Sequence, residues 1–510
     1  MHILRLNKNK IFNCMPICIL FVAVISVLLY GFSDGIQGND FWWHVKVGEW
    51  IVQNREIPVK DIFSWYGIEH GIPWTAHEWL SEVIFYLIYH NFHEFGIFIF
   101  AFLSAYIMLY LLWRETKKYI NQNILICGLF YVLLATVAVS FFYGRPHVFS
   151  YLLLFCTLKV LYQYYENVDS KWIYSMPLIA VLWGNLHGGS SNLTYLLCGV
   201  FFVSGLCTIK LGCIRGERLS NKWIVRLLIV TMLTVAALTV NPAGIKILSY
   251  PYSNMSDDLM TRLISEWQSP DAKNIGHLIL FYFPIGMLGI GFVTQNKKIR
   301  IIDAFIMILF LFLFLRSIRF IMLWYVAASF CAFPYMLELK VKAIEKKRDI
   351  IICIIAFSLL TAVSLMNVAK IGYNLKRGEL ISKVLSKEVI EFVKSENPQR
   401  LFNDYNFGES LIFEDIAVFF DARADVYSGN GMLADGAGLL LLQQLQDKEK
   451  VQFNVEEIIC KYNFDALLVA KNRPLYVYLI SNQENYEVAY EDNVAAYFRI
   501  THFPAQTCIQ

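Results

Sequence analysis

Apolar runs long enough to cross a lipid bilayer recur along most of this chain. A helix needs roughly 20 apolar residues to span the hydrocarbon core of a membrane. Hydrophobic residues make up 57% of the sequence and charged residues only 17%, a balance that requires lipid as the solvent. We therefore predict a polytopic α-helical membrane protein with about eleven transmembrane helices. The predicted spans lie near residues 11–32, 95–114, 122–142, 146–165, 172–187, 190–210, 222–240, 276–294, 301–316, 318–338 and 350–368.

The distribution of lysine and arginine predicts the orientation, because these residues are enriched in cytoplasmic loops. With a cytoplasmic N-terminus, the inner connections include the basic segments 114–118, 210–222, 297–300 and 340–348. The opposite loops are neutral or acidic, and residues 33–78 carry seven Asp/Glu against three Lys/Arg. We therefore predict a multi-pass protein of the cell (plasma or inner) membrane with its N-terminus in the cytoplasm.

One segment of the predicted first outer loop, residues 33–92, has two interpretations. Residues 79–90 are apolar but too short for a span, and they include Glu82. Counting them as a span would also place Lys117 and Lys118 outside. We interpret the segment as a helix lying on the outer membrane surface.

The composition changes after the last predicted span. Charged and apolar residues mix there, with short β-like runs at residues 466–470 and 495–499. The length of this region is in the usual range for a domain. We predict a transmembrane module of residues 1–368 and an extracytoplasmic soluble α/β domain of residues 369–510.

Polar side chains collect at the predicted outer ends of the spans. Charged groups at membrane depth are costly, so they usually pair or face a water-filled cavity. Carboxylates and histidines beside arginines suit a site that moves a proton and holds an anion, since guanidinium binds phosphate through two hydrogen bonds. We predict one outward-facing polar cavity lined by Asp40, His44, His77, Glu78, Arg145, His147, Asn185, His187, Glu266, Arg316 and Arg319.

Several of these features also have simpler interpretations. The tryptophans of the first outer loop are more typical of an interfacial aromatic belt than of a sugar-stacking platform. His187, next to Gly188, is equally compatible with a hydrogen-bonded turn. Arg316 or Arg319 could anchor a helix end by snorkelling, although two arginines in an otherwise apolar stretch favour a function.

Some function classes are excluded or disfavoured. The formal net charge is only +3 and no basic patch stands out, which argues against nucleic-acid binding. The sequence lacks a GxxxxGK[ST] loop, which argues against an ATP-driven pump. No cysteine or histidine spacing is typical of a structural zinc site. Cys460 and Cys508 lie in the predicted outer domain, where a disulfide could form.

Short motifs extend from the first outer loop to the C-terminal region. They are Asn39-Asp40-Phe-Trp-Trp-His44, Ile57-Pro58, Asp61-Ile-Phe-Ser64, Pro73-Trp74, His77-Glu78-Trp79-Leu80, Arg145-Pro146-His147, Asn185-Leu-His187-Gly188, Asn241-Pro242-Ala-Gly244, Glu266-Trp267, Arg316-Ser-Ile-Arg319, Asn403-Asp404-Tyr405 and Asp421-Ala-Arg423-Ala-Asp425. Over nearly the full chain, this pattern resembles that of bacterial membrane proteins in the GT-C glycosyltransferase superfamily, in a largely uncharacterised branch.

The resemblance implies a GT-C-like helix arrangement and transfer of a sugar from a polyprenyl-phosphate donor to an acceptor on the outer face. An acidic residue of the first outer loop is typically essential in this superfamily, and Asp40 occupies the similar position. A second acid often precedes it by two residues, where this chain has Gly38. That departure bears on any role that needs a carboxylate pair, such as metal ligation, and the need for a divalent metal ion stays open.

These expectations combine into one mechanistic hypothesis. Asp40 accepts the proton of the acceptor hydroxyl, which attacks the anomeric carbon with inversion. His77 and Glu78 orient Asp40 or bind the acceptor. The arginines Arg145, Arg316 and Arg319 stabilise the departing polyprenyl phosphate.

Two alternatives remain at this stage. A transporter or flippase of lipid-linked saccharides would use the same basic groups without forming a bond, although no inverted repeat supports it. The C-terminal domain could also carry the specific function, with the membrane part as its anchor. The partners expected in each case are membrane lipid and a lipid-linked sugar, while the sugar and the acceptor stay open.

Overall fold

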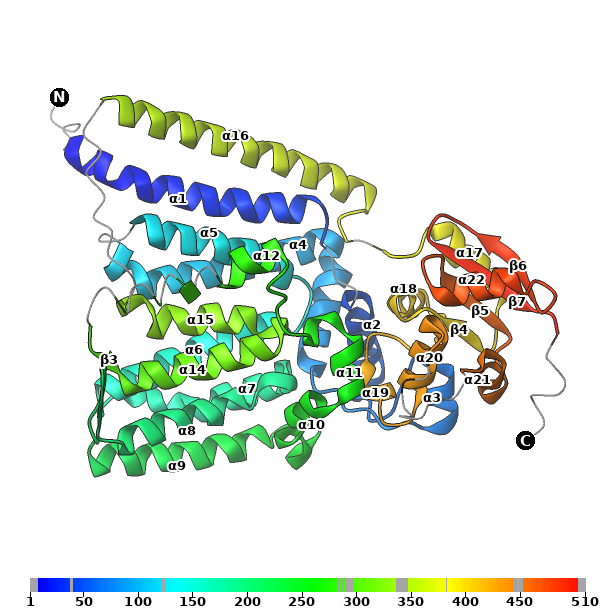
Figure 1. Cartoon of the computed structure of the whole chain (residues 1–510), viewed down its shortest axis with the longest axis horizontal. Helices are drawn as coiled ribbons and strands as arrows, with labels where there is room; N and C mark the ends of the chain where they lie inside the picture. The colour runs from blue at the N-terminus through cyan, green and yellow to red at the C-terminus, as the bar shows by residue number, and fades with distance from the viewer. Residues whose placement is uncertain are drawn as a thin grey trace. The chain divides into compact units, whose positions relative to one another are not determined.

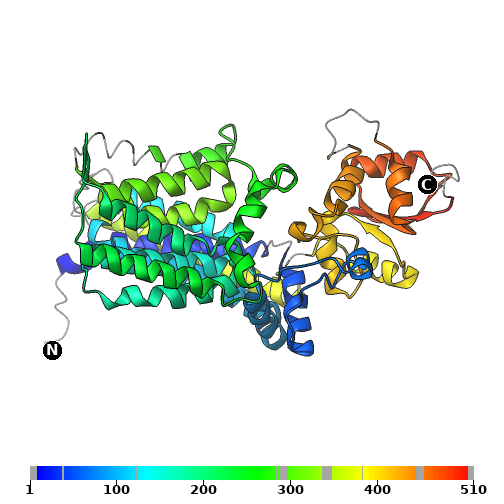
Figure 2. The same cartoon turned by 90° about the horizontal axis from the view of Figure 1, so that it is seen from below.

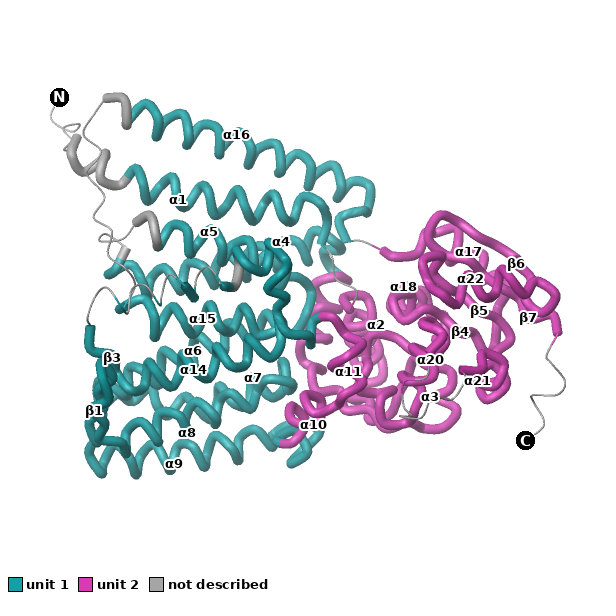
Figure 3. The backbone as a smooth tube through the Cα atoms, viewed as in Figure 1, with its two compact units in different colours: residues 1–37, 91–248, 266–381 teal, residues 38–90, 249–265, 382–510 magenta. Residues whose placement is uncertain are grey.

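The structure is a computed structural model that describes residues 8–36, 40–120, 124–282, 285–286, 289, 293, 297–335, 347–381, 383–443, 445 and 453–502. The chain forms two compact units (Figure 3), each built from segments that are far apart in the sequence. Unit 1 comprises residues 1–37, 91–248 and 266–381, and unit 2 comprises residues 38–90, 249–265 and 382–510.

Unit 1 is a bundle of long helices that lie side by side (Figures 1 and 2). Helix α1 packs between α16 and α5, and α14 packs against α15 and α8. The bundle contains α1 (Lys8–Ser33), the C-terminal part of α4 (Trp79–Ile120), α5 (Ile124–Phe141), α6 (His147–Glu166), α7 (Met176–Leu186), α8 (Leu193–Leu206), α9 (Asn221–Leu238), the short α12 (Ile275–His277), α14 (Ile301–Arg316), α15 (Ile321–Cys331) and α16 (Lys347–Arg377). Predicted spans 122–142, 276–294 and 318–338 lie partly outside the described residues. The described part of each predicted span except 276–294 overlaps one of these long helices, although α7 and α15 are shorter than predicted.

Among the described residues, five helical segments are long and apolar enough to cross a membrane: Met15–Ser33, Trp79–Tyr119, Gly188–Leu206, Asn221–Leu238 and Ile350–Arg377. Other apolar helices, such as Cys127–Phe141 and Ile318–Cys331, are shorter. The helical membrane character is therefore supported, whereas the count of about eleven spans is not confirmed.

The ambiguous segment 79–90 is helical and belongs to unit 2, whereas the rest of α4 belongs to unit 1. The backbone of His93 has φ 50° and ψ −146°, which is not helical, so α4 consists of two helices joined at a kink. The position of residues 79–90 on the membrane surface stays a prediction.

Loops predicted on the cytoplasmic side meet at one end of unit 1. Strand β1 (Ile209–Leu211) pairs antiparallel with β2 (Ile214–Gly216), and β2 pairs parallel with β3 (Ile299–Arg300). Nearby in the sequence, Lys222 forms an ion pair of 2.7 Å with Asp169. The predicted alternation of the spans requires these loops to share an end, but which side of the membrane they face stays a prediction.

Unit 2 is an α/β assembly around a four-stranded sheet in the order β4-β5-β7-β6. Strands β4 and β5 are parallel and the other neighbours are antiparallel. The runs predicted from residues 466–470 and 495–499 form β5 and β7. The elements are α2 (Phe41–Asn54), α3 (Trp65–His70), the start of α4, α10 (Tyr250–Ser256), α11 (Asp258–Leu263), α17 (Lys387–Glu396), β4 (Leu401–Asn403), α18 (Gly408–Phe413), α19 (Ala424–Tyr427), α20 (Met432–Leu441), α21 (Val455–Tyr462), β5 (Ala466–Ala470), α22 (Pro474–Ser481), β6 (Tyr486–Glu491) and β7 (Ala495–Ile500).

The first outer loop and the C-terminal region share one hydrophobic core in unit 2. Trp43, Trp65 and Trp74 are buried in the same cluster as Phe402 and Leu467 of the sheet. These tryptophans therefore do not form the interfacial belt that the sequence favoured, because they pack inside the protein. The predicted boundary between a transmembrane module and a soluble domain at residues 368 and 369 stays a prediction. In the structure, residues 38–90 fold together with residues 382–510 in unit 2.

A buried ionic network fastens the outer loop to the C-terminal region. Arg423 Nη1 lies 2.9 Å from Asp61 Oδ1, and its Nη2 lies 2.6 Å from Asp421 Oδ2. The Tyr427 hydroxyl donates to Asp421 at 2.6 Å, and the Arg423 guanidinium lies over the Trp74 ring at 4.8 Å. All three charged side chains are fully buried, so the two carboxylates depend on one guanidinium.

Arg423→Met is therefore expected to destabilise unit 2 by about 3–5 kcal/mol, because it leaves two buried carboxylates without their cation. Tryptophan fluorescence during unfolding of the purified chain would measure the change. Arg499→Met is the matched control, since Arg499 pairs with Glu396 on the surface and is expected to cost under about 1 kcal/mol. Equal losses in the two variants would contradict the role of the buried network.

Candidate functional site

Helical spacing brings the titratable residues of the first outer loop together in unit 2. His44 and Gly48 lie one turn apart on the same face of α2, and Glu82 of α4 lies one turn after Glu78, the residue that precedes this helix. At Gly48 an added Cβ would lie 2.1 Å from the Glu82 carbonyl oxygen, so the two backbones approach each other closely there. Only glycine allows this approach. It places the His44 side chain against the two carboxylates.

The contacts within this cluster are short and buried. His44 Nδ1 lies 3.4 Å from Glu82 Oε1, and His44 Nε2 lies 3.9 Å from Glu78 Oε2. His77 Nε2 lies 3.3 Å from the other Glu78 oxygen. His44, Glu78 and Glu82 are 2%, 6% and 1% exposed, respectively. Of these four, Glu82 was noted in the sequence only as evidence against a transmembrane span.

Residues from distant segments complete the cluster. The His77 ring lies 4.3 Å from the ring of Tyr250, whose hydroxyl donates to Asp425 at 2.8 Å. Burial lowers the pKa of His77, but the negative charges of Glu78 and Asp425 outweigh it, and the net pKa lies above the ordinary value. The role of Tyr250 was not anticipated from the sequence, because no local pattern links residue 250 to residue 77.

Asp40 lies at the N-terminus of this arrangement. It is the N-cap residue of α2, and its carbonyl oxygen accepts a hydrogen bond from the His44 amide at 3.3 Å. Asp40 is half-buried and lies one helical turn before His44. Asn39 and Gly38, which belong to the same motif, lie outside the described residues.

The predicted outer residues of unit 1 form a second cluster. Arg145 Nη1 donates to Glu266 Oε1 at 2.6 Å. Arg319 Nε donates to His147 Nε2 at 2.8 Å, and the guanidinium of Arg319 lies over the Trp267 ring. These residues come from three separate outer turns of the predicted topology, which therefore meet at one end of unit 1.

His187 extends this second cluster into the bundle. Its ring lies 4.3 Å from that of His147, and its Nδ1 lies 2.5 Å from Ser150 Oγ and 2.9 Å from Ser190 Oγ. Trp183 Nε1 also donates to both serine hydroxyls. His187 thus sits in a buried hydrogen-bonded turn, as its simpler interpretation proposed, while also contacting a predicted site residue.

Two further predicted residues have different surroundings. Asn185 Nδ2 donates to the Val240 carbonyl at 2.8 Å, so it ties the end of α7 to the end of α9. Arg316 is exposed at the C-terminal end of α14, and its carbonyl oxygen accepts from Ser269.

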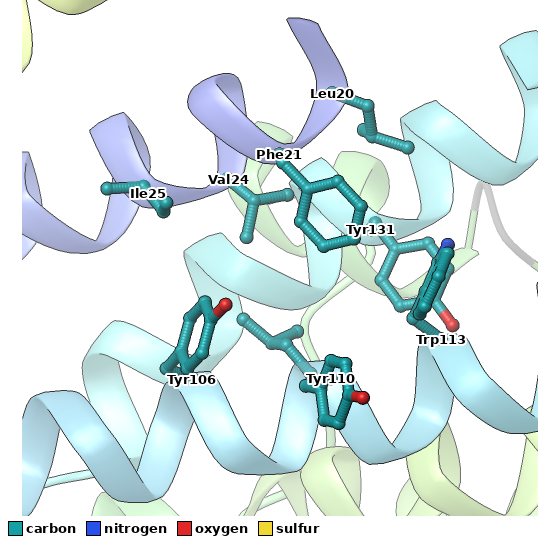
Figure 4. Close-up of a pocket in the computed structure, with 9 residues that line it drawn as sticks. Leu20, Phe21, Val24, Ile25, Tyr106, Tyr110, Trp113 and Tyr131 are labelled. Atoms are coloured by element: carbon teal, nitrogen blue, oxygen red, sulfur yellow. The ribbon is translucent and has the colours of Figure 1, made fainter. Parts of the chain in front are cut away.

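Two apolar cavities of unit 1 lie apart from these predicted residues. One, of about 20 Å³, is lined by aromatic and aliphatic side chains of α1, α4 and α5, including Phe21, Tyr110 and Trp113 (Figure 4). The other, of about 260 Å³, is lined mainly by α14 and α15. Their linings offer hydrocarbon contact rather than acid–base chemistry.

The arrangement thus separates two kinds of chemistry. Unit 2 gathers carboxylates and imidazoles, which suit proton transfer or metal binding. Unit 1 gathers guanidinium groups, which suit an anion such as phosphate. The single cavity expected from the sequence stays a prediction, since the residues divide between two units.

The Arg145–Glu266 pair predicts a pH-dependent stability. Burial raises the pKa of Glu266, but Arg145 and Arg319 lower it more, so its net pKa is below the ordinary value. The stabilisation is therefore complete above the unfolded pKa and is lost as pH falls through the lower, folded pKa. Glu266 is 35% exposed, so solvent screening limits its size.

Glu266→Gln is expected to cost about 1 kcal/mol at pH 7. The difference from the unchanged protein should shrink as pH falls below the ordinary range for glutamate, because Glu266 itself then becomes neutral. Thermal unfolding across pH would measure it. Glu166→Gln removes a surface partner of Arg300 and serves as the control. A cost that does not vary with pH would contradict the ionic explanation.

Comparisons with known proteins bear on the fold. Searches against protein-family models and against curated proteins find no match. The apo structure of the Archaeoglobus fulgidus oligosaccharyltransferase is similar, with a TM-score of 0.51 and 11% identity over 89% of this chain and 69% of that chain. A structure of the archaeal oligosaccharyltransferase AglB from Archaeoglobus fulgidus, in complex with an inhibitory peptide and a dolichol-phosphate, is also similar. Its TM-score is 0.53 and its sequence identity is 9%, over 89% of this chain and 69% of that chain. These similarities support the GT-C fold and a multi-pass membrane protein with a C-terminal α/β region.

Proposed function

We propose that this protein is a membrane glycosyltransferase that transfers a sugar from a polyprenyl-phosphate donor to an acceptor on the extracytoplasmic face. The observation that carries the proposal is the gathering of His44, His77 and Glu78, with Asp40 one helical turn before His44 at the N-cap of α2. The GT-C fold supports it, since the similar structures are oligosaccharyltransferases. One of them holds a dolichol-phosphate, which supports a lipid-linked donor here.

In this proposal Asp40 is the general base. It removes the proton of the acceptor hydroxyl while the oxygen attacks the anomeric carbon, and the bond to the lipid phosphate breaks with inversion. General-base assistance accelerates such a step by about a hundred- to ten-thousand-fold. His77 and Glu78 hold the acceptor or orient the base, and their ion pair makes them a single polar unit.

Arg145 and Arg319 stabilise the departing phosphate, with Arg316 as a further cation. Positive charge placed where negative charge develops lowers the barrier to bond cleavage. Arg145 pairs with Glu266 and Arg319 with His147, so both guanidinium groups are already held in position. Asn185 and His187 support the turns that carry this cluster.

The proposed location is the cell membrane, with a cytoplasmic N-terminus and unit 2 outside. The basic loops that meet around β2 and β3 fit the cytoplasmic side by their charge. Cys460 of unit 2 is disulfide-bonded, which suits an oxidising compartment. Cys508, which the sequence offered as a partner, lies outside the described residues.

Asp40→Asn tests the proposal. The variant keeps the shape of the side chain but cannot accept the proton, so transfer should fall about a hundred- to ten-thousand-fold. Mass spectrometry of product lipids and acceptors from membranes would measure the new glycosidic bond. Asp34→Asn is the control, because Asp34 is a half-exposed partner of Lys370 in unit 1. Full transfer by correctly folded Asp40→Asn protein would eliminate the proposed base.

A transporter or flippase of lipid-linked saccharides is the alternative. It needs the arginines to hold phosphate but does not need Asp40 as a proton acceptor. Movement of the lipid-linked sugar without any new glycosidic bond would favour the transporter, whereas bond formation would favour the transferase.

A further inference from the structure

The cluster in unit 2 contains three side chains of the types that bind metal ions. His44, Glu78 and Glu82 each offer one ligand atom, and these atoms all lie within 4.8 Å of one another. All three residues are buried. Ligands bound to one transition-metal ion at about 2.0–2.2 Å stand roughly 3–3.5 Å apart, so shifts of about 1 Å or less would close the set.

Within the described residues, Glu82 carries a carboxylate oxygen that this cluster leaves unsatisfied. Glu78 and Glu82 are one helical turn apart, and two buried carboxylates at that spacing repel each other. His77 pairs with Glu78, and His44 Nδ1 faces the other oxygen of Glu82. Glu82 Oε2 has less than 1 Å² of exposed surface and no hydrogen-bond partner among the residues that the structure describes. A buried acceptor in this state carries a desolvation cost that a cation would remove.

The surroundings hold the three side chains in place. The Trp43 ring lies 3.7 Å from the His44 ring, and the Phe85 ring lies 6.1 Å from it. The close approach at Gly48 fixes α2 against α4 next to Glu82. His44 and Glu82 thus come from packed helices, and Glu78 lies directly before α4, which favours a defined geometry.

We propose that His44, Glu78 and Glu82 bind one divalent first-row transition-metal ion, with Zn²⁺ as the first candidate. One imidazole and two carboxylates form a three-ligand set that leaves a further position for water or a substrate oxygen. The imidazole favours Zn²⁺ over Mg²⁺, Ca²⁺ and Mn²⁺, which oxygen ligands suit better. The site does not depend on the proposed sugar transfer, because its charge balance and ligand geometry arise within unit 2.

The purified full chain in lipid nanodiscs provides the test. After removal of metal with a chelator and addition of Zn²⁺, elemental analysis should find about one zinc per chain. Glu82→Gln and His44→Asn should each weaken Zn²⁺ binding at least tenfold, which is the usual cost of a lost ligand or supporting contact. Glu49→Gln is the control, since Glu49 lies on α2 but pairs with Lys46 at the surface.

X-ray absorption spectroscopy of the zinc-loaded, unsubstituted protein supplies a measurement that needs no variant. The expected spectrum shows nitrogen and oxygen ligands at about 2.0–2.1 Å with an imidazole contribution. Absence of stoichiometric zinc, sulfur ligands, no imidazole, or unchanged binding by folded Glu82→Gln and His44→Asn proteins would each overturn the proposal. Because metal content is measured apart from catalysis, loss of the transferase proposal would leave this result standing.

Discussion

The need to balance charge away from water governs both units of this protein. A buried ion without a partner costs several kcal/mol, so each one must meet a counter-ion or hydrogen-bonding groups. Arg423 meets two aspartates in unit 2. In unit 1, the buried Asp303 accepts hydrogen bonds from Arg300 and from the hydroxyls of Tyr162 and Tyr335. Such contacts join segments far apart in the sequence and thereby define which segments fold together.

The same requirement distinguishes structural clusters from candidate sites. Around Arg423 and Asp303, the charged side chains form ion pairs and hydrogen bonds with partners within the fold. At Glu82, one carboxylate oxygen has no hydrogen-bond partner among the described residues, and an ion or a proton would satisfy it. Groups whose charge is left to an outside partner are suited to binding and proton transfer. This difference, rather than the number of polar residues, is the reason for proposing a functional role for the cluster of His44, Glu78 and Glu82.

Local patterns predicted local structure well. The apolar run 301–316 coincides with α14, and the β-like run 466–470 coincides with β5, because both depend on neighbouring residues. Pairings across the chain had no such signal, as with Asp61 and Arg423. Glu82 shows the same limit: its charge indicated that 79–90 is not a span, but no local pattern linked it to His44.

The organisation of unit 2 also changes how its C-terminal region can act. Trp42 of α2 packs against Phe413 of α18 with ring centroids 4.4 Å apart, and Lys46 of α2 forms a 2.7 Å ion pair with Asp415. Removing residues 380–510 would therefore strip α2 of partners, and with them the support of the helix that begins after Asp40. An acceptor bound near α18 would lie beside α2, the helix that begins directly after the proposed base. Acceptor binding by the C-terminal region is therefore compatible with the transferase and does not compete with it.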